Sequence, residues 1–243
     1  MRNIMITIEY DGTNYGGWQK QNNTLSIQQV IEEAIYKITK ERVNLISSGR
    51  TDAGVHAIGQ VANFMTNSKI LVEKIPNAIN SKLPNDISVV DAKEVSFNFH
   101  ARYSAKKKRY KYVILNSKYK RPIYRNYSYY VKYDLDIDKM KEEIKFLIGE
   151  HDFKSFMSSG SSVKTTVRTI YDVNINKQDD LIILEFEGNG FLYNMVRIIV
   201  GTLVDIGRGK IDISLKNIID CKDRNKAGHT APACGLFLKK VYY

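Results

Sequence analysis

The chain has 243 residues, 43% of them hydrophobic and 11% aromatic, which suffices for the core of one large domain or of two ordinary ones. Its formal net charge of +11 favours a polyanionic partner such as a nucleic acid, although a merely basic cytoplasmic protein would share that charge. Two cysteines are too few for a disulfide framework. The sequence shows no signal peptide and no apolar run near the ~18 residues of a membrane span, so a cytoplasmic protein is expected.

The N-terminal half alternates between strand and helix patterns. Residues Ile4–Glu9 form a β-branched run that predicts a strand, and Ser26 is the expected N-cap of a helix over Ile27–Lys40 with an apolar stripe. A shorter helix follows two further strands and must hold Pro76 in its first turn. With a last strand over Ile87–Val95, the order is the βαββαβ of a ferredoxin-like unit.

The C-terminal half predicts a second mixture of strands and helices. The expected strands are Ala101–Leu115, Tyr127–Val131, Thr166–Ile175, Leu181–Glu187 and Gly235–Tyr242, and the expected helices are Ile137–Leu147, capped by Asp136, and Asn194–Gly207. We therefore expect an α+β protein of two ferredoxin-like halves, residues 1–104 and 105–243. Because no flexible tether separates these halves, their mainly antiparallel sheets are expected to join.

The stretch Ser47–Phe64 (SSGRTDAGVHAIGQVANF) joins two of the N-terminal strands and contains too many small residues for a regular element. It places one carboxylate, Asp52, between Arg50 and a run of small side chains. Loops held between rigid elements often carry chemistry. An ordinary turn would use the same residues, because Asp closes Asx-turns and Gly supplies a positive φ. Spacing alone leaves both interpretations open.

The order of these residues resembles a known family. The run GRTDAGVHAIGQVANF is similar to the motif of the TruA-type tRNA pseudouridine synthases, and further stretches match in chain order: YDGTNYGGWQKQ, FHARYSAKKKRYKY, HDFKSF, GNGFLYNMVRIIVGTL and APACGLFLKKVYY. The resemblance implies that Asp52 is the catalytic residue. It also implies a homodimer that acts on uridines in the anticodon stem-loop of tRNA.

A basic run, KKKRYKY, lies in the first strand expected for the C-terminal half. Period-two alternation puts Lys107, Arg109 and Lys111 on one face of that strand and Lys106, Lys108, Tyr110 and Tyr112 on the other. Cations beside rings would allow phosphate contact together with base stacking, whereas a solvated strand edge would need neither. The resemblance assigns stacking on the target uracil to Tyr110, for which a core position is the alternative.

Arg197 stands in the very apolar helix expected over Asn194–Gly207. Such a helix must be largely buried, and an unpaired guanidinium inside it would cost several kcal/mol. Asp205 shares the polar stripe of the helix but lies roughly 12 Å along its axis, a long reach for a direct pair. The resemblance favours Asp52 as the partner, with Arg50 as a second cation, and the alternative is that Arg197 reaches solvent.

The stretch Tyr10–Gln21 holds the only tryptophan of the chain, Trp18, beside two tyrosines, a lysine and several amide side chains. This mixture could stack on bases and contact phosphates. A surface loop pinned by one aromatic ring would have the same composition.

The expected chemistry needs one ionised carboxylate and no cofactor. An arginine pair would hold Asp52 charged at neutral pH, so that it could attack or stabilise an oxocarbenium-like centre. The sequence has no Walker or dinucleotide motif, and Cys221, His229 and Cys234 are too few and too irregularly spaced for zinc. The sequence thus predicts a cofactor-free isomerase acting on tRNA, with a non-catalytic RNA-binding protein as the rival.

Overall fold

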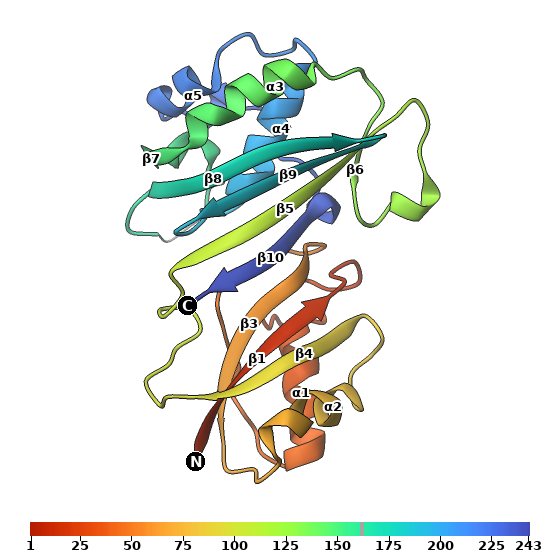
Figure 1. The fold of residues 1–243 in the computed structure, drawn as a ribbon, viewed down its shortest axis with the longest axis vertical. Helices are drawn as coiled ribbons and strands as arrows, with labels where there is room; N and C mark the ends of the chain where they lie inside the picture. The colour runs from red at the N-terminus through yellow and green to blue at the C-terminus, as the bar shows by residue number, and fades with distance from the viewer. Residues whose placement is uncertain (161–162) are drawn as a thin grey trace. The chain divides into compact units, whose positions relative to one another are not determined.

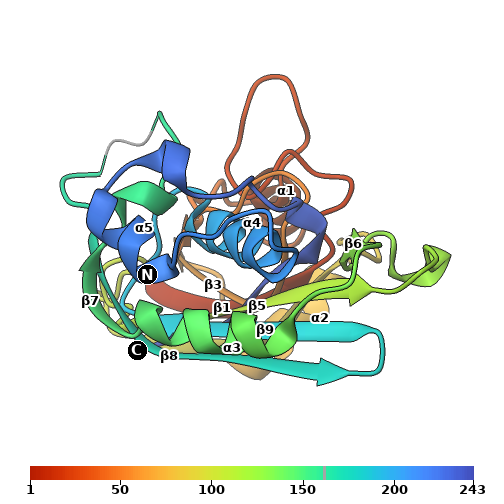
Figure 2. The same ribbon diagram turned by 90° about the horizontal axis from the view of Figure 1, so that it is seen from above.

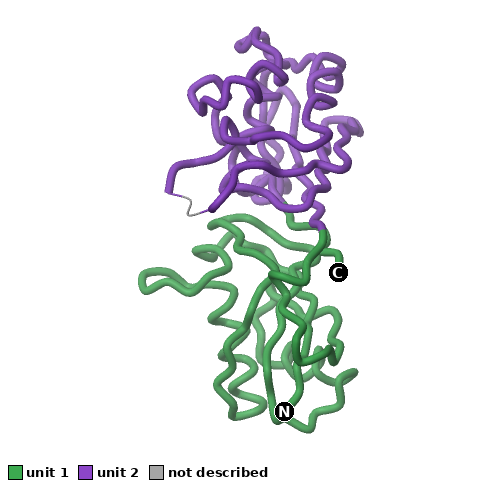
Figure 3. The backbone as a smooth tube through the Cα atoms, turned by 90° about the vertical axis from the view of Figure 1, so that its left-hand side faces the viewer, with its two compact units in different colours: residues 1–106, 237–243 green, residues 107–236 purple. Residues whose placement is uncertain are grey.

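The structure, a computed structural model, describes residues 1–160 and 163–243. The chain divides into two compact units, shown in Figure 3: Met1–Lys106 with Phe237–Tyr243 form unit 1, and Lys107–Leu236 form unit 2. This division differs from the expected halves because the last strand of the chain clusters with unit 1. That strand pairs in parallel with a strand of unit 1, in a register that places Phe237 opposite His56.

Unit 1 is built on a sheet with the strand order β4-β1-β3-β10, and β2 pairs with β3. Its strands are β1 (Arg2–Tyr10), β2 (Ile46–Ser47), β3 (His56–Thr66), β4 (Ile87–Val95) and β10 (Leu236–Tyr242), and its helices are α1 (Ile27–Thr39) and α2 (Ile75–Asn80). Strand β1 runs antiparallel to both of its neighbours, β3 and β4 (Figure 1). The expected βαββαβ order is confirmed, with Pro76 in the first turn of α2.

The core of unit 1 follows from the alternation of its first strand. Ile4, Ile6 and Ile8 are fully buried, and Ile31 and Ile35 of α1 are buried as well. Burying one such side chain contributes about 1.5–3 kcal/mol. The predicted cap of α1 is also confirmed, because the Ser26 hydroxyl accepts a hydrogen bond from the Gln29 amide at 3.2 Å.

Unit 2 is built on a sheet with the strand order β5-β9-β8-β7, and β6 pairs in parallel with β5. Its strands are β5 (Lys107–Asn116), β6 (Tyr129–Val131), β7 (Gly149–Asp152), β8 (Val167–Gln178) and β9 (Leu181–Gly188), and its helices are α3 (Ile137–Ile144), α4 (Met195–Gly207) and α5 (Leu215–Cys221). The pairs β5–β9, β9–β8 and β8–β7 are antiparallel. The α+β class with mainly antiparallel sheets is confirmed, and the joining of the sheets stays a prediction.

Several boundaries in unit 2 differ from the sequence expectation, and two of them have a cause visible in the structure. Strand β5 begins at Lys107 rather than at Ala101, whose amide instead donates to the Asn63 side chain at 2.8 Å. Helix α3 ends at Ile144 and continues as a 3-10 turn over Lys145–Leu147. The strand starts later because the chain before it bonds to a distant side chain. The helix ends earlier because its last turn tightens into a 3-10 turn.

Helix α4 is the most deeply buried element of unit 2. Within α4, every residue except Arg197 is buried. The helix lies against α3, where Gly207 leaves so little space that a Cβ added to it would lie 2.9 Å from the Met140 sulfur. Figures 1 and 2 show α4 beside the sheet of unit 2. Its expected burial is therefore confirmed.

Candidate functional site

Asp52 lies in a tight turn between β2 and β3 of unit 1. The Val55 amide donates to the Asp52 carbonyl at 3.1 Å, and Gly54 has a φ of +75°. The Asp52 side chain is half-buried and that of Arg50 is exposed. The sequence Thr-Asp-Ala-Gly thus forms the turn that its residues favour. The turn presents a carboxylate at its edge, so a turn-forming role and a chemical role are compatible.

The backbone of this turn is held by the loop that follows β1. The Trp18 amide donates to the Thr51 carbonyl at 3.0 Å, and the Tyr10 hydroxyl lies 2.8 Å from the Thr51 hydroxyl. Gly17 has a φ of +96°, and a Cβ there would lie 2.5 Å from the Thr51 carbonyl oxygen. Only glycine fits at this approach. The position of the residue before Asp52 is therefore set from three directions.

A second contact of the same loop supports the far end of the turn. A Cβ on Gly12 would lie 2.0 Å from the Val55 carbonyl oxygen, so the two backbones touch. The Gly12 amide donates to Nδ1 of His56, a buried ring that stacks on Phe237 at a centroid distance of 4.8 Å. The same Nδ1 lies 3.1 Å from Oδ1 of Asp11, so the ring has a second polar neighbour in this loop. His56 therefore acts here as a packed, hydrogen-bonded part of unit 1.

The aromatic rings of this loop are buried and do not form a surface for stacking bases. Tyr10, Tyr15 and Trp18 are 3%, 6% and 2% exposed, and Tyr15 donates its hydroxyl to Asp86 at 2.6 Å. Burial raises the pKa of the Tyr10 phenol. The base-stacking interpretation of the loop is wrong for these three rings. Tyr10 and Trp18 instead hold Thr51, the residue before Asp52, whereas Tyr15 is bound to Asp86.

The basic run of β5 is partly neutralised within unit 2. Lys107 donates to Oε1 of Glu187 at 2.6 Å, and Arg109 donates to Oε2 through Nε at 2.9 Å. Glu187 lies opposite Arg109 on β9, and its side chain is only 7% exposed. The hydrogen bond from Lys107, followed by that from Arg109, lowers the pKa of Glu187. These two half-buried cations thus form an ion cluster around one nearly buried acid. Sequence reasoning missed Glu187, because its place opposite Arg109 depends on strand register.

The remaining residues of the run have different surroundings. Lys106 is exposed, and Lys108 and Lys111 are half-buried. Tyr110 is half-buried, with its ring edge-on to Phe191 at 5.0 Å between centroids. Tyr112 is fully buried and donates its hydroxyl to the Pro232 carbonyl at 2.6 Å. Of the two tyrosines expected on one strand face, Tyr112 therefore belongs to the core, whereas Tyr110 remains a candidate for stacking.

Arg197 lies in the first turn of α4 with two of its guanidinium nitrogens engaged. Nε donates to the Ala231 carbonyl at 2.8 Å, and one terminal nitrogen donates to the Asn194 side chain at 2.7 Å. The guanidinium is thus oriented by groups from two segments of unit 2. The carboxylate of Asp205 is bound by other groups, which agrees with the long distance expected between Arg197 and Asp205 along the helix. Pairing of Arg197 with Asp52 stays a prediction.

Residues 228–231 run along α4 and were missed by the sequence reasoning. The Gly228 amide donates to the Thr202 hydroxyl at 2.9 Å, and the Ala231 amide donates to the Arg197 carbonyl at 3.1 Å. A Cβ on Gly201 would lie 1.8 Å from the His229 carbonyl oxygen. Gly201 in the middle of an apolar helix was the signal in the sequence, because such a glycine often marks a close backbone approach.

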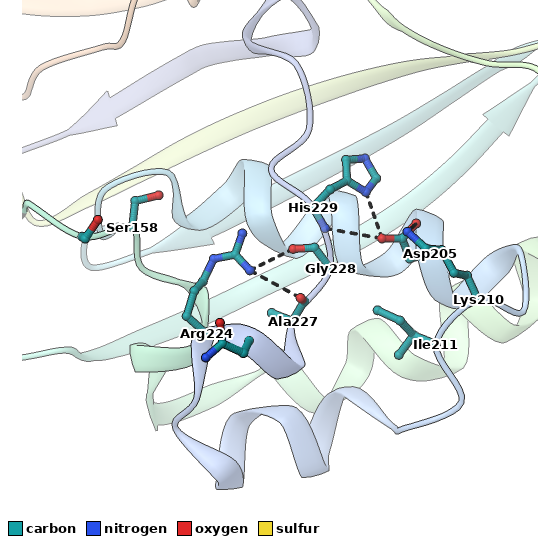
Figure 4. A pocket seen from close by; sticks show the side chains of 10 residues that line it. Ser158, Asp205, Lys210, Ile211, Arg224, Ala227, Gly228 and His229 are labelled. Carbon is teal, nitrogen blue, oxygen red and sulfur yellow. Dashed lines mark hydrogen bonds and ion pairs between the residues drawn. The ribbon is translucent and has the colours of Figure 1, made fainter.

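A cavity of about 580 Å³ opens on unit 2 beside this contact (Figure 4). Nδ1 of His229 lies 2.9 Å from Oδ2 of the buried Asp205, and Lys210 lies 3.7 Å from Oδ1. The cavity is lined by Ser158, Ser159, Asp205, Lys210, Ile211, Arg224, Asn225, Ala227, Gly228 and His229. Arg224 donates to the Gly228 carbonyl at 2.9 Å and so braces the lining loop. None of the expected site residues lines this cavity.

Two further expectations concern metals and membranes. Among residues 1–160 and 163–243, no group of three or more His, Cys, Asp or Glu side chains could hold a metal ion. Cys234 instead donates its thiol to the Ser128 carbonyl at 3.3 Å, while Cys221 is exposed. In the same described part of the chain, no helix has the length and apolar character needed to span a membrane.

Comparison with known proteins identifies the family that the motifs resemble. A family model described as tRNA pseudouridine synthase matches residues 6–104 and 144–243. A tRNA pseudouridine synthase A of Thermoanaerobacter sp. (strain X514) is 58% identical over 244 residues, which cover 100% of both chains. The proteins of that name from Caldicellulosiruptor saccharolyticus and Acetivibrio thermocellus are 56% and 52% identical, again over 100% of both chains. The resemblance drawn from the motifs is confirmed.

Proposed function

Because the chain belongs to the tRNA pseudouridine synthases, which are isomerases, we propose that it converts uridine to pseudouridine in the anticodon stem-loop of tRNA with Asp52 as the catalytic carboxylate. The observation that carries this proposal is the rigid turn that presents Asp52. Its backbone is braced by Trp18 and Gly17 while the carboxylate stays half-buried. Such bracing limits the reorganisation needed during reaction.

The reaction exchanges one bond to the ribose for another. The bond from N1 of the uracil to C1′ breaks, the base turns, and C5 bonds to C1′; C5 then loses its proton and N1 takes one up, so the product is an isomer of the substrate. This change needs no oxidant and no reductant, so we expect no cofactor. Asp52 either attacks C1′ or promotes elimination to a glycal, and an ionised carboxylate is required in both routes.

Arg197 and Arg50 are the proposed cations that keep Asp52 ionised. Two nitrogens of the Arg197 guanidinium are fixed by Ala231 and Asn194, which restricts the directions in which its other nitrogen can donate. An opposite charge within a few ångströms lowers the pKa of a carboxyl group. A fixed arginine therefore suits the task of orienting the carboxylate as well as charging it.

Tyr110 is the proposed stacking partner of the flipped uracil, and its half-buried ring next to Phe191 supports this role. Lys106, Lys107, Lys108, Arg109 and Lys111 are proposed to contact phosphates, and the exposed Lys106 is the best candidate among them. Lys107 and Arg109 would first have to leave the carboxylate of Glu187, a charged acceptor that binds both. The family resemblance favours a homodimer, and the two cysteines without a disulfide framework favour the cytoplasm.

The deciding experiment is the replacement Asp52→Asn. It keeps the size and the turn-forming ability of the side chain but removes its charge. Pseudouridine formation on unmodified tRNA should fall by several orders of magnitude, because the reaction loses its carboxylate. Melting temperature and tRNA affinity should stay near the wild-type values.

Asp86→Asn provides a matched control, because Asp86 is also an acid of unit 1 but binds Tyr15. That variant should lower stability by about 1 kcal/mol and leave turnover intact. If Asp52→Asn retains most of the turnover, Asp52 is not the catalytic carboxylate. If the wild-type protein binds tRNA without modifying it, the rival reading of an RNA-binding protein without catalysis is correct.

A further inference from the structure

The segment between β5 and β6 has an unusual composition that the proposed active site does not use. Residues 116–133 (NSKYKRPIYRNYSYYVKY) contain five basic side chains, six tyrosines and no acidic residue. The basic residues are Lys118, Lys120, Arg121, Arg125 and Lys132, and the tyrosines are Tyr119, Tyr124, Tyr127, Tyr129, Tyr130 and Tyr133. Interleaved cations and rings of this kind are typical of surfaces that bind single-stranded nucleic acid.

The structure closes this segment at its base. Asn116 pairs with Val131 where β5 and β6 run in parallel, and its side-chain amide donates to the carbonyls of Val131 at 3.1 Å and Tyr133 at 2.8 Å. The residues between these strands project from the sheet of unit 2 as a separate excursion (Figures 1 and 2). The segment is thus tied down at its base while its side chains are presented outward.

Cations and rings of the segment lie in contact with one another. Lys118 lies over the Tyr119 ring at 5.4 Å, Lys120 over Tyr130 at 6.0 Å and Lys132 over Tyr133 at 5.1 Å. Arg208, the C-cap residue of α4, lies 3.8 Å from the centre of the Tyr133 ring and adds a cation from outside the segment. We name these seven residues the β5–β6 cation–tyrosine surface.

The rings of this surface are accessible, unlike those of the Trp18 loop. Tyr119 is 71% exposed and Tyr133 is 47% exposed. Tyr130 is more constrained, because its hydroxyl donates to the Lys118 carbonyl at 3.0 Å. The cations held beside these rings disfavour an apolar partner, because burying a charge without a counter-charge costs free energy.

We propose that the β5–β6 cation–tyrosine surface binds unpaired nucleotides of the tRNA substrate, with bases stacked on Tyr119 and Tyr133 and phosphates held by Lys118, Lys120 and Lys132. Every base has a π face, and every unpaired nucleotide brings one phosphate, so this ligand satisfies both halves of the surface. Protein interfaces are instead depleted in lysine. The proposal rests on tRNA being the substrate, as proposed above.

The test compares ring removal with ring conservation. Tyr119→Ala and Tyr133→Ala should each weaken binding of unmodified tRNA by about 5- to 150-fold, the range of one lost base stack. Tyr119→Phe and Tyr133→Phe should bind nearly as well as the wild type, because the stacking face remains. Tyr171→Ala is the matched control, since Tyr171 is a 50% exposed tyrosine of β8 outside the surface. Turnover at saturating tRNA should change little in all five variants.

A second measurement isolates the cations. A triple variant replaces Lys118, Lys120 and Lys132 by Met. The slope of log K for tRNA binding against log salt concentration should become shallower by roughly 2. The control is a second triple variant that loses the same amount of charge from the helical part of unit 2, namely Lys141→Met, Lys145→Met and Lys216→Met. Melting temperature measured for every variant detects any loss of fold.

Several results would overturn the proposal. If both alanine variants bind tRNA with wild-type affinity, no base stacks on these rings. If the alanine and phenylalanine variants lose equal amounts of tRNA affinity, the rings do not act by stacking. A change in sedimentation without a change in tRNA affinity would assign the surface to a contact between protein chains. The binding measurement does not require turnover, so a failed isomerase assay and a failed binding test remain distinguishable.

Discussion

Arg109 and Glu187 face each other across neighbouring strands, with Nε and one terminal nitrogen of the guanidinium 2.9 and 2.7 Å from the same carboxylate oxygen. Lys107 occupies the other oxygen of Glu187 at 2.6 Å. The basic run of β5 is therefore anchored to β9 by one nearly buried acid. Part of the positive charge that suggested a nucleic-acid surface stabilises the sheet instead.

The Glu187 cluster predicts acid-sensitive stability. Its lowered pKa means that the folded state holds the carboxylate charged below the ordinary glutamate pKa of ~4.3. The stabilisation is thus fully present above about pH 4.3 and is lost as the pH falls through the lower, folded-state pKa. Glu187→Gln should cost about 1–3 kcal/mol at pH 7. The difference from wild type should shrink in acid.

Urea unfolding at pH 7 and at about pH 3 measures this difference. Glu185→Gln is the control, because Glu185 lies farther from the same guanidinium, at 3.7 Å from Arg109. An equal penalty for Glu187→Gln at both pH values would mean that its charge contributes nothing to the fold.

Arg197→Met should reduce both activity and stability. The change removes the donor to the Ala231 carbonyl and, if Arg197 pairs with Asp52, leaves that carboxylate without its cation. We expect a loss of about 3 kcal/mol in the free energy of unfolding together with a large loss of turnover. Arg197→Lys keeps the charge but not the planar geometry, and should recover stability better than activity. Unchanged melting and turnover in Arg197→Met would mean that Arg197 supports neither the fold nor the Asp52 carboxylate.

Tyr110→Ala should lose turnover while keeping most of the tRNA affinity, because cations supply most of the binding free energy. Tyr110→Phe keeps the ring and tests the hydroxyl alone. Tyr112→Phe is the neighbouring control, since it removes only the hydrogen bond to the Pro232 carbonyl and should cost about 1 kcal/mol of stability. Normal turnover in Tyr110→Ala would assign Tyr110 to packing against Phe191.

Gly17→Ala should move the Asp52 turn. The new Cβ would lie 2.5 Å from the Thr51 carbonyl oxygen at a φ of +96°, so we expect a loss of about 1–3 kcal/mol and lower turnover. Gly209→Ala is the matched control, because Gly209 has a φ of +68° with nothing within 4 Å of the added Cβ. It should cost only the backbone strain. If both variants keep full turnover, bracing by Gly17 is not needed for catalysis.

The sequence by itself determined the local elements and the residues that could carry chemistry. The apolar stripe and the Ser26 cap of α1 were readable because helix periodicity and capping involve residues only three or four positions apart. The turn at Asp52 and the burial of α4 around Arg197 were equally readable, since turn residues and a continuous apolar run are local signals. The family resemblance then supplied roles for these residues.

Only the tertiary structure decided how distant residues neutralise or bury one another. The residues around Trp18 have the composition of a base-stacking loop. The Trp18 ring is nevertheless only 2% exposed, because the loop folds onto the Asp52 turn. Lys107 and Arg109 look like phosphate ligands until the register of β5 and β9 places Glu187 between them. Strand register and loop docking minimise the free energy of the whole core, so no window of neighbouring residues contains them.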